Sequence, residues 1–285
     1  MNLSDLKEID ELRQVSFGEH KCFLHKEHRW VLPIIFYNQK KEILPHPCTL
    51  VTFDAHRDYL NPNCSCKKDI LRIRKSGITF DGIVHLCQEK LRKLNDDWIT
   101  VGMELGFIDD AVIFYEGDDE PYNENLKEEY KDQQGNIHKI KVLRFLSTEL
   151  GFQGNLSDTA RLESLSELWK ILGWQYNSNF SFLENERKIL LDLDLDFFIV
   201  RWKGCYKFPW PDEVFKKEFL VQSTYQETKG WTGKDFVDGL VKMAALLTIA
   251  REPDCCGGKI KANEVLGKVN HFLFDSKLNL DKIPG

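Results

Sequence analysis

The chain has 285 residues, enough for one large domain that buries several strands with helices on both faces. Its 42% hydrophobic and 12% aromatic content excludes a disordered protein, and its net charge of −6 without a long basic run excludes nucleic acid as an expected partner. The acidic N-terminus and the lack of a long apolar run predict no signal peptide, no membrane contact and a cytoplasmic location. We expect a single domain over residues 1–285.

Short β-rich runs alternate with helical patterns along the chain. Strands are predicted at 21–25, 48–54, 98–103, 111–116, 140–146, 188–198 and 245–250, and helices at 29–41, 80–94, 159–173, 233–244 and 261–274. This alternation is typical of βαβ units, and strands made mostly of Val, Ile and Leu require a sheet that is covered on both faces. The sequence therefore predicts a three-layer α/β/α sandwich with a mainly parallel central sheet.

Two other features are expected to lie outside the chemistry. Residues 117–139 are strongly polar with Gly and Asn turn signals, which predicts an exposed insertion or hairpin rather than a specific binding arm. The eight cysteines are expected to be reduced, and neither Cys64-x-Cys66 nor the Cys255-Cys256 pair has the paired CxxC spacing of a structural zinc site.

Metal-binding side chains follow the strand predicted at 48–54. In "LVTFDAHRDYL", residues 50–60, the apolar run leads into Asp54, His56 and Asp58. A strand that entered an ordinary turn would more often end on Gly, Asn or Pro. Because strings of this kind also occur in turns and helix caps, the motif needs partners elsewhere in the chain to indicate a site.

A second carboxylate cluster supplies those partners. In "ILLDLDLDFF", Asp192, Asp194 and Asp196 alternate with apolar residues, so an extended chain points all three to one side. Three buried carboxylates repel one another and lose hydration, so they require a cation. Both clusters lie at predicted carboxyl ends of strands, where open α/β sheets bind ligands. Carboxylate and imidazole ligands without thiolate favour manganese or a similar divalent ion.

These motifs resemble those of a known enzyme family. "FDAHRD" resembles the DAHxD motif of arginases and agmatinases, and "DLDLDFF" resembles their SxDxD motif, in the same chain order. Together with "KEHRWVLPIIF", they make the chain similar to the divergent arginase-like family that includes the peptide arginases, which convert arginine to ornithine within ribosomally made peptides. The resemblance spans roughly residues 20–255 through scattered motifs.

The resemblance implies a centre of two Mn²⁺ ions. The GGDHS-type motif that supplies a histidine ligand in the ureohydrolases is absent, and His28 of the Glu27-His28 pair takes its place. The implied metal ligands are His28, Asp54, His56, Asp58, Asp194 and Asp196. Asp192 then occupies the Ser position of SxDxD as a supporting carboxylate; a register shifted by two would instead make Asp192 and Asp194 the ligands.

The implied reaction is attack on the guanidinium carbon by a hydroxide that bridges the two ions, with release of urea. The departing amine needs a proton, and Asp58 or Asp192 is the expected relay. A carboxylate must also accept the N–H groups of the guanidinium, for which Glu252 is the first candidate and Glu104, expected at another strand end, the second.

The loop "YLNPNCSCKK" lacks the arginase pattern that contacts the α-carboxylate and α-amino groups of free arginine. The expected substrate is therefore arginine within a peptide, from a ribosomally made precursor, and a homo-oligomer is compatible with the sequence. Three alternatives remain open: a ureohydrolase for free arginine or agmatine, a metal-dependent deacetylase or amidohydrolase, and a non-catalytic protein that keeps the site for structure or metal sensing.

Overall fold

A mixed eight-stranded sheet forms the centre of the computed structural model, which describes residues 6–7, 9–92, 96–115, 127–144, 189–202, 206–222 and 232–280. In spatial order the strands are β1 (Arg13–Phe17), β2 (His20–His25), β10 (Ala244–Ala250), β7 (Ile189–Asp194), β3 (Cys48–Asp54), β4 (Ile108–Tyr115), β6 (Ile137–Arg144) and β5 (Lys127–Lys131). The strands from β2 to β6 in this order run parallel to one another, and the two edge strands β1 and β5 are antiparallel to their neighbours.

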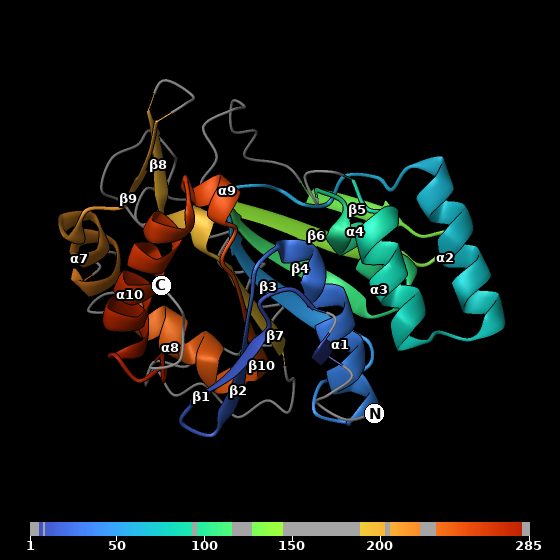
Figure 1. The fold of residues 1–285 in the computed structure, drawn as a ribbon, viewed down its shortest axis with the longest axis horizontal. Helices are drawn as coiled ribbons and strands as arrows, with labels where there is room; N and C mark the ends of the chain where they lie inside the picture. The colour runs from blue at the N-terminus through green and yellow to red at the C-terminus, as the bar shows by residue number, and fades with distance from the viewer. Residues whose placement is uncertain are drawn as a thin grey trace.

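Helices cover both faces of the sheet (Figure 1). One layer contains α1 (Val31–Lys40), α2 (Cys64–Ser76), α3 (Phe80–Glu89) and α4 (Trp98–Glu104), and the other contains α7 (Asp212–Leu220), α8 (Gly233–Met243) and α10 (Lys259–Phe274). The three-layer α/β/α class predicted from the sequence is confirmed. None of the helices in the described part of the chain is long and apolar enough to cross a membrane.

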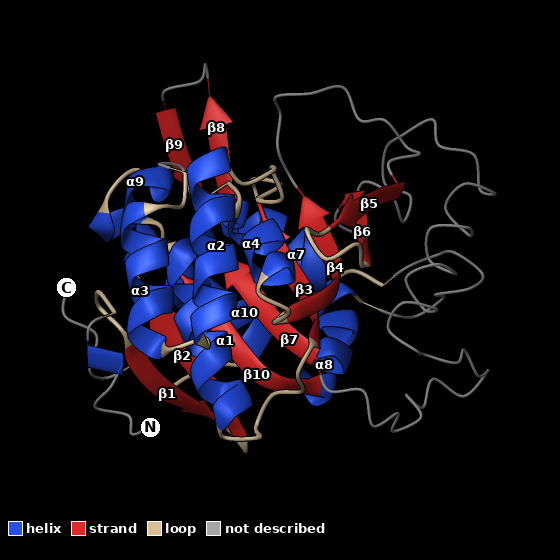
Figure 2. Ribbon diagram, turned by 90° about the vertical axis from the view of Figure 1, so that its right-hand side faces the viewer, coloured by secondary structure: helices blue, strands red, loops and turns tan. Residues whose placement is uncertain are grey.

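Smaller elements gather beyond the carboxyl ends of the central strands. They are the short 3-10 helices η2 (His28–Trp30) and η3 (Leu195–Phe198), the hairpin of β8 (Ile199–Trp202) and β9 (Tyr206–Pro209), and the short helix α9 (Pro253–Cys256). Figure 2 shows this hairpin and α9 together at one end of the sheet. The parallel strands therefore deliver their connections to one edge of the sheet.

The alternation of β7 separates apolar from acidic side chains. Ile189, Leu191 and Leu193 belong to the core beneath α8 and α10, whereas Leu190 belongs to the core beneath α1 and α4. Because side chains alternate along a strand, Asp192 shares the face of Leu190. The acidic face of β7 is thus turned toward the layer of α1 and α4.

One predicted strand is wrong. Residues 98–103 form most of helix α4, every residue of which is buried. Periodicity cannot distinguish a short helix that is buried on all sides from a buried strand, and the β-branched residues Ile99, Thr100 and Val101 biased the prediction. Glu104 consequently ends a helix and not a strand.

Other predictions have mixed outcomes. The strand predicted at 188–198 ends at Asp194, and residues 195–198 form the 3-10 helix η3, so Asp196 lies beyond the strand that holds Asp192 and Asp194. The polar segment 117–139 is described only from residue 127, where β5 and β6 form the expected hairpin, although Tyr130 and His138 are buried in it. The helix predicted at 159–173 lies outside the described residues. Helices α2 and α7 were not predicted, because their exposed faces are largely polar.

We expect the close packing of α4 to make Gly102→Val destabilising. A Cβ atom at this position would meet Ile108 Cδ1 at 2.6 Å and Leu32 Cδ2 at 3.2 Å. Overpacking of this kind costs about 1–3 kcal/mol in the free energy of unfolding, measured by denaturant titration. Gly267→Ala is the control, because nothing lies within 4 Å of its added Cβ on helix α10, and it should stabilise by roughly 0.5–1 kcal/mol. Unchanged stability of the Gly102 variant would contradict the packing described.

Candidate metal centre

The connections that follow four neighbouring parallel strands meet at the carboxyl edge of the sheet. His28 follows β2, His56 follows β3, Asp196 follows β7 and Glu252 follows β10. The strand order β2-β10-β7-β3 makes these connections neighbours in space, although they lie far apart in sequence. This is the position at which open α/β sheets bind ligands.

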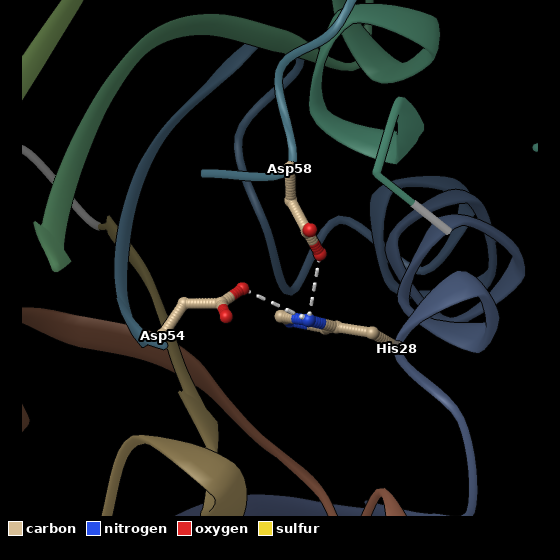
Figure 3. Close-up of side chains that lie close together, drawn as sticks. All are labelled: His28, Asp54 and Asp58. Carbon is tan, nitrogen blue, oxygen red and sulfur yellow. Dashed lines mark ion pairs between the residues drawn. The ribbon is translucent and has the colours of Figure 1, made fainter. Parts of the chain in front are cut away.

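We call the first set of residues the inner group: His28, Asp54, Asp58 and Asp194. His28 Nδ1 lies 3.2 Å from Asp54 Oδ2 and 3.1 Å from Asp58 Oδ2 (Figure 3). Asp194 Oδ2 lies 3.1 Å from the same nitrogen. His28 Nδ1 and Asp54 Oδ2 are buried and make no hydrogen bond within the described residues. A cation among these atoms would satisfy both.

We call the second set the outer group: Asp54, His56 and Asp196. His56 Nδ1 lies 3.1 Å from Asp196 Oδ2 and 3.7 Å from Asp54 Oδ1. One ligand atom from each residue falls within 4.8 Å of the others, as it also does for His28, Asp54 and Asp58. Asp54 thus turns one oxygen to each group. The two groups differ in access, since the His56 side chain is 40% exposed and His28 is buried.

Asp192 lies behind His28. Its Oδ2 is 2.5 Å from His28 Nε2 and accepts a hydrogen bond of 2.8 Å from Thr52, and its Oδ1 accepts one of 2.6 Å from Thr248. Both threonines pair directly with Asp192 across the sheet. A carboxylate on the far nitrogen of a histidine fixes the orientation of the ring and directs the other nitrogen toward a metal. This arrangement favours Asp194 and Asp196 as ligands over the register shifted by two.

Charge and burial conflict in the acidic residues. Burial raises the pKa of Asp54 to about 7, with a further contribution from Asp58. Burial and the neighbouring Asp196 carboxylate raise the pKa of Asp194 well above its usual range. Burial alone would also raise the pKa of Asp192, but His28 and the Thr248 hydroxyl hold it below its ordinary value. The inner group therefore needs a cation to hold all of its carboxylates in the ionised form.

Backbone amides help to hold the outer carboxylates. The His56 N–H donates to Asp54 Oδ1 at 2.6 Å, and the Ala55 N–H donates to Asp196 Oδ1 at 3.3 Å. Burial alone would lower the pKa of His56, but Asp196 raises it to about 10. In the absence of a metal, the outer group is therefore an ion pair.

Glu252 lies beside the inner group, as expected for a carboxylate at a strand end. Its Oε1 accepts a hydrogen bond of 2.6 Å from the His28 backbone N–H. The residue is 9% exposed and has left-handed backbone angles (φ 36°, ψ 61°), which are uncommon outside Gly, Asn and Asp. Burial raises the pKa of Glu252 to about 8, and the Asp194 charge adds to the shift.

Glu104, the second candidate, is held elsewhere. Its carboxylate accepts hydrogen bonds from the Tyr130 hydroxyl at 2.5 Å and from the Gln133 backbone and side chain, each at 3.2 Å. These partners belong to the β5–β6 hairpin, so Glu104 anchors the hairpin to α4. The contacts of the two glutamates distinguish Glu252 as the one beside the candidate metal ligands.

Three residues that support the centre were not predicted: Thr52, Thr248 and Trp98. The threonines have a signal in the sequence, because each is a polar residue at an alternate position of an apolar strand. Trp98 had none, since its segment was predicted as a strand. No protein-family model matches the chain, and a search of curated proteins finds no matching sequence. The interpretation of the centre therefore depends on its geometry.

We expect divalent metal to stabilise the protein through Asp54. At a metal concentration 100-fold above the dissociation constant, binding adds about 2.7 kcal/mol to the free energy of unfolding. Asp54→Asn should lose most of this gain, because the shared residue contributes to both groups. Thermal unfolding with and without Mn²⁺ measures the effect, and Asp254→Asn, an exposed aspartate on α9, is the control. A full gain in the Asp54 variant would refute the shared role.

We expect Asp192→Asn to weaken metal binding by roughly 10- to 100-fold, because the neutral amide orients His28 less firmly. Equilibrium dialysis against Mn²⁺ measures the affinity. Asp132→Asn is a matched control, since Asp132 is also buried and accepts three hydrogen bonds from Gln134 and Asn136 in the β5–β6 turn. Asp132→Asn should lower the free energy of unfolding and leave the Mn²⁺ affinity unchanged. Equal Mn²⁺ affinities in the two variants would argue against the orienting role of Asp192.

Proposed function

We propose that the protein is a binuclear metallohydrolase of the arginase-like family that hydrolyses the guanidinium group of arginine within a peptide, giving ornithine and urea. The observation that carries this proposal is the pair of metal-binding groups that share Asp54 at the carboxyl edge of a parallel sheet. The order of the DAHRD and DLDLDFF motifs along the chain supports the family.

Manganese is the metal that we propose. The inner group would hold one ion through His28, Asp54, Asp58 and Asp194, and the outer group the other through Asp54, His56 and Asp196. The ligands are carboxylates and imidazoles without thiolate, which suits Mn²⁺. When bound, such ions supply Lewis acidity and lower the pKa of water toward neutrality.

The charge of the site favours a cationic substrate. The inner and outer groups contain four aspartates, and Asp192 and Glu252 add two further buried carboxylates. When all six carboxylates are ionised, two divalent ions leave the set with a net charge of −2. A guanidinium brings a compensating positive charge, whereas the amide of an acylated lysine brings none. This balance supports a ureohydrolase over a deacetylase.

Glu252 is the residue that we propose for guanidinium binding. It lies beside His28, and its carboxylate can accept N–H groups in a charge-assisted contact. The departing amine takes up a proton, for which Asp58 is the proposed relay. Asp192 is unsuited to that task because Thr52, Thr248 and His28 enclose its oxygens. Asp192 instead positions His28.

The loop after Asp58 supports a peptide substrate. Asn63 caps α2, where its Oδ1 accepts hydrogen bonds from the Cys66 backbone at 2.9 Å and from the Ser65 hydroxyl at 2.7 Å. These polar groups are engaged within the protein and not offered to the α-groups of free arginine. In a peptide those α-groups are amides and need no charged partner.

The test uses the full-length, Mn²⁺-loaded protein with an arginine-containing peptide, free arginine, agmatine and an acetyl-lysine peptide. Atoms balance as guanidine plus water giving amine plus urea, so the peptide should lose CH2N2 by mass spectrometry while urea appears. Faster turnover of free arginine or agmatine would replace the peptide assignment with the small-molecule alternative. Release of acetate without urea would overturn the reaction class.

Glu252→Gln should lower kcat/KM for the guanidine substrate by roughly 10- to 100-fold, through the loss of one charge-assisted hydrogen-bonding partner. Glu104→Gln is the matched comparison, because its contacts with Tyr130 and Gln133 make it structural. It should reduce the melting temperature and leave kcat/KM of the folded protein unchanged. The opposite pattern would exchange the roles of the two glutamates.

A further inference from the structure

The start of helix α4 is bound to the segment that carries Asp58. The Ile99 backbone N–H donates to the Asp58 carbonyl at 3.1 Å, and the Leu60 N–H donates to the Asp96 carbonyl at 2.8 Å. The Thr100 hydroxyl adds a hydrogen bond of 2.7 Å to the Leu60 carbonyl. Two hydrogen bonds between main-chain groups and one from a side-chain hydroxyl thus fix residues 58–60 against one helix end.

This fixation matters because Asp58 has a backbone conformation that is uncommon for a side-chain-bearing residue. Its φ is +48°, in the left-handed region. A residue in that region keeps its conformation only when its surroundings determine it. The hydrogen bonds at the start of α4 hold the Asp58 backbone in this conformation and so set the direction in which its side chain points.

Trp98, the first residue of α4, contacts two members of the inner group. Its indole Nε1–H donates to Asp58 Oδ2 at 2.8 Å, and its ring centroid lies 4.8 Å from that of His28. Trp98 and His28 are both buried. One rigid side chain therefore limits the rotation of the Asp58 carboxylate and the tilt of the His28 ring.

The outer group depends on other supports. The His56 backbone N–H donates to Asp54 Oδ1, the oxygen that faces His56, and the Ala55 N–H donates to Asp196 Oδ1. These bonds belong to the β3 and β7 connections themselves. The supports of the inner and outer groups can therefore be altered separately.

We propose that Trp98 is a positioning residue that sets the affinity of the inner metal site and leaves the outer site intact. The inference rests on the metal centre of the proposed function but not on its substrate. Its consequence is that the two ions are held by separable means, so that one substitution outside the ligand set yields a protein with a single ion.

The test is Trp98→Phe, which removes the indole N–H and keeps an aromatic ring. Equilibrium dialysis of the full-length protein against graded Mn²⁺, with bound metal counted by elemental analysis, should show one of two sites weakened by roughly 10- to 100-fold. Electron paramagnetic resonance should show loss of the spin-coupled signal of paired ions in favour of an isolated Mn²⁺. Neither measurement uses a substrate, so it stays informative if no urea is formed.

Trp30→Phe is the matched control. Trp30 is a buried tryptophan two positions from His28, and its Nε1 makes no hydrogen bond within the described residues. The same substitution there should leave both affinities within about twofold, because it removes no ligand-bound donor. His56→Asn removes a ligand of the outer site and should therefore leave a single ion, bound at the inner site. Combined with Trp98→Phe, it should leave only weak binding.

Thr100→Val keeps the inference testable if Trp98→Phe fails to fold, as judged by circular dichroism and a cooperative melt. It removes the bond to the Leu60 carbonyl and should weaken the same single site, by a smaller factor. The inference is overturned if the folded Trp98 variant binds both ions as tightly as the Trp30 variant does, or if both sites weaken equally. For Thr100→Val, unchanged binding would have the same meaning.

Discussion

Buried negative charge is the constraint on which the rest of this structure depends. Asp54, Asp192 and Asp194 lie in the closed interior at the edge of the sheet, where loss of hydration and mutual repulsion oppose ionisation. The charge of Asp192 is stabilised within the protein, since His28 and two threonines are hydrogen-bonding partners of its carboxylate. Asp54 and Asp194, together with Asp58, converge on His28 Nδ1, an atom that can hydrogen bond to only one of them. The unmatched charge is what makes the cluster a candidate metal site, in contrast to a structural ion pair.

The fold supplies this arrangement through register. Parallel pairing sets Thr52, Asp192 and Thr248 in one row across three strands, and the next residues of the same parity are Asp54 and Asp194. The row nearest the strand ends holds the candidate ligands, and the row below it holds the group that orients His28. Asp192, which orients His28, and the candidate ligand Asp194 thus lie two residues apart on the same face of β7. No separate loop is needed to place the supporting carboxylate.

Much of this could be predicted from the sequence, because the relevant information is local. Asp54 and Asp58 lie in one short string, and alternation alone predicts that Asp192 and Asp194 share a face. Resemblance to the arginase-like family added His28. The sandwich architecture followed from strands with continuous apolar runs.

The remainder could not be predicted, because it arises from contacts between segments far apart in the chain. The hydrogen bonds of Asp192 to two threonines need the strand order, which a single sequence does not specify. The sequence of helix α4 predicts a strand, because burial on all sides removes the periodicity that distinguishes a helix from a strand, and a strand at this place gives no reason to expect Trp98 beside His28. For Glu104 and Glu252, only the contacts in three dimensions distinguish a residue that anchors a hairpin from one that lies beside the candidate metal ligands.

The alternation in β7 also restricts which changes in chain length the protein can accept. A deletion or insertion of one residue within Ile189–Asp194 would rotate the aspartates into the hydrocarbon core beneath α8 and α10, and would turn leucines toward His28. The misplaced aspartates would remain buried, because helices cover both faces of the strand. We therefore expect evolution to exchange the apolar residues of this strand among themselves while preserving its length, and to place length variation in the segments that connect the strands.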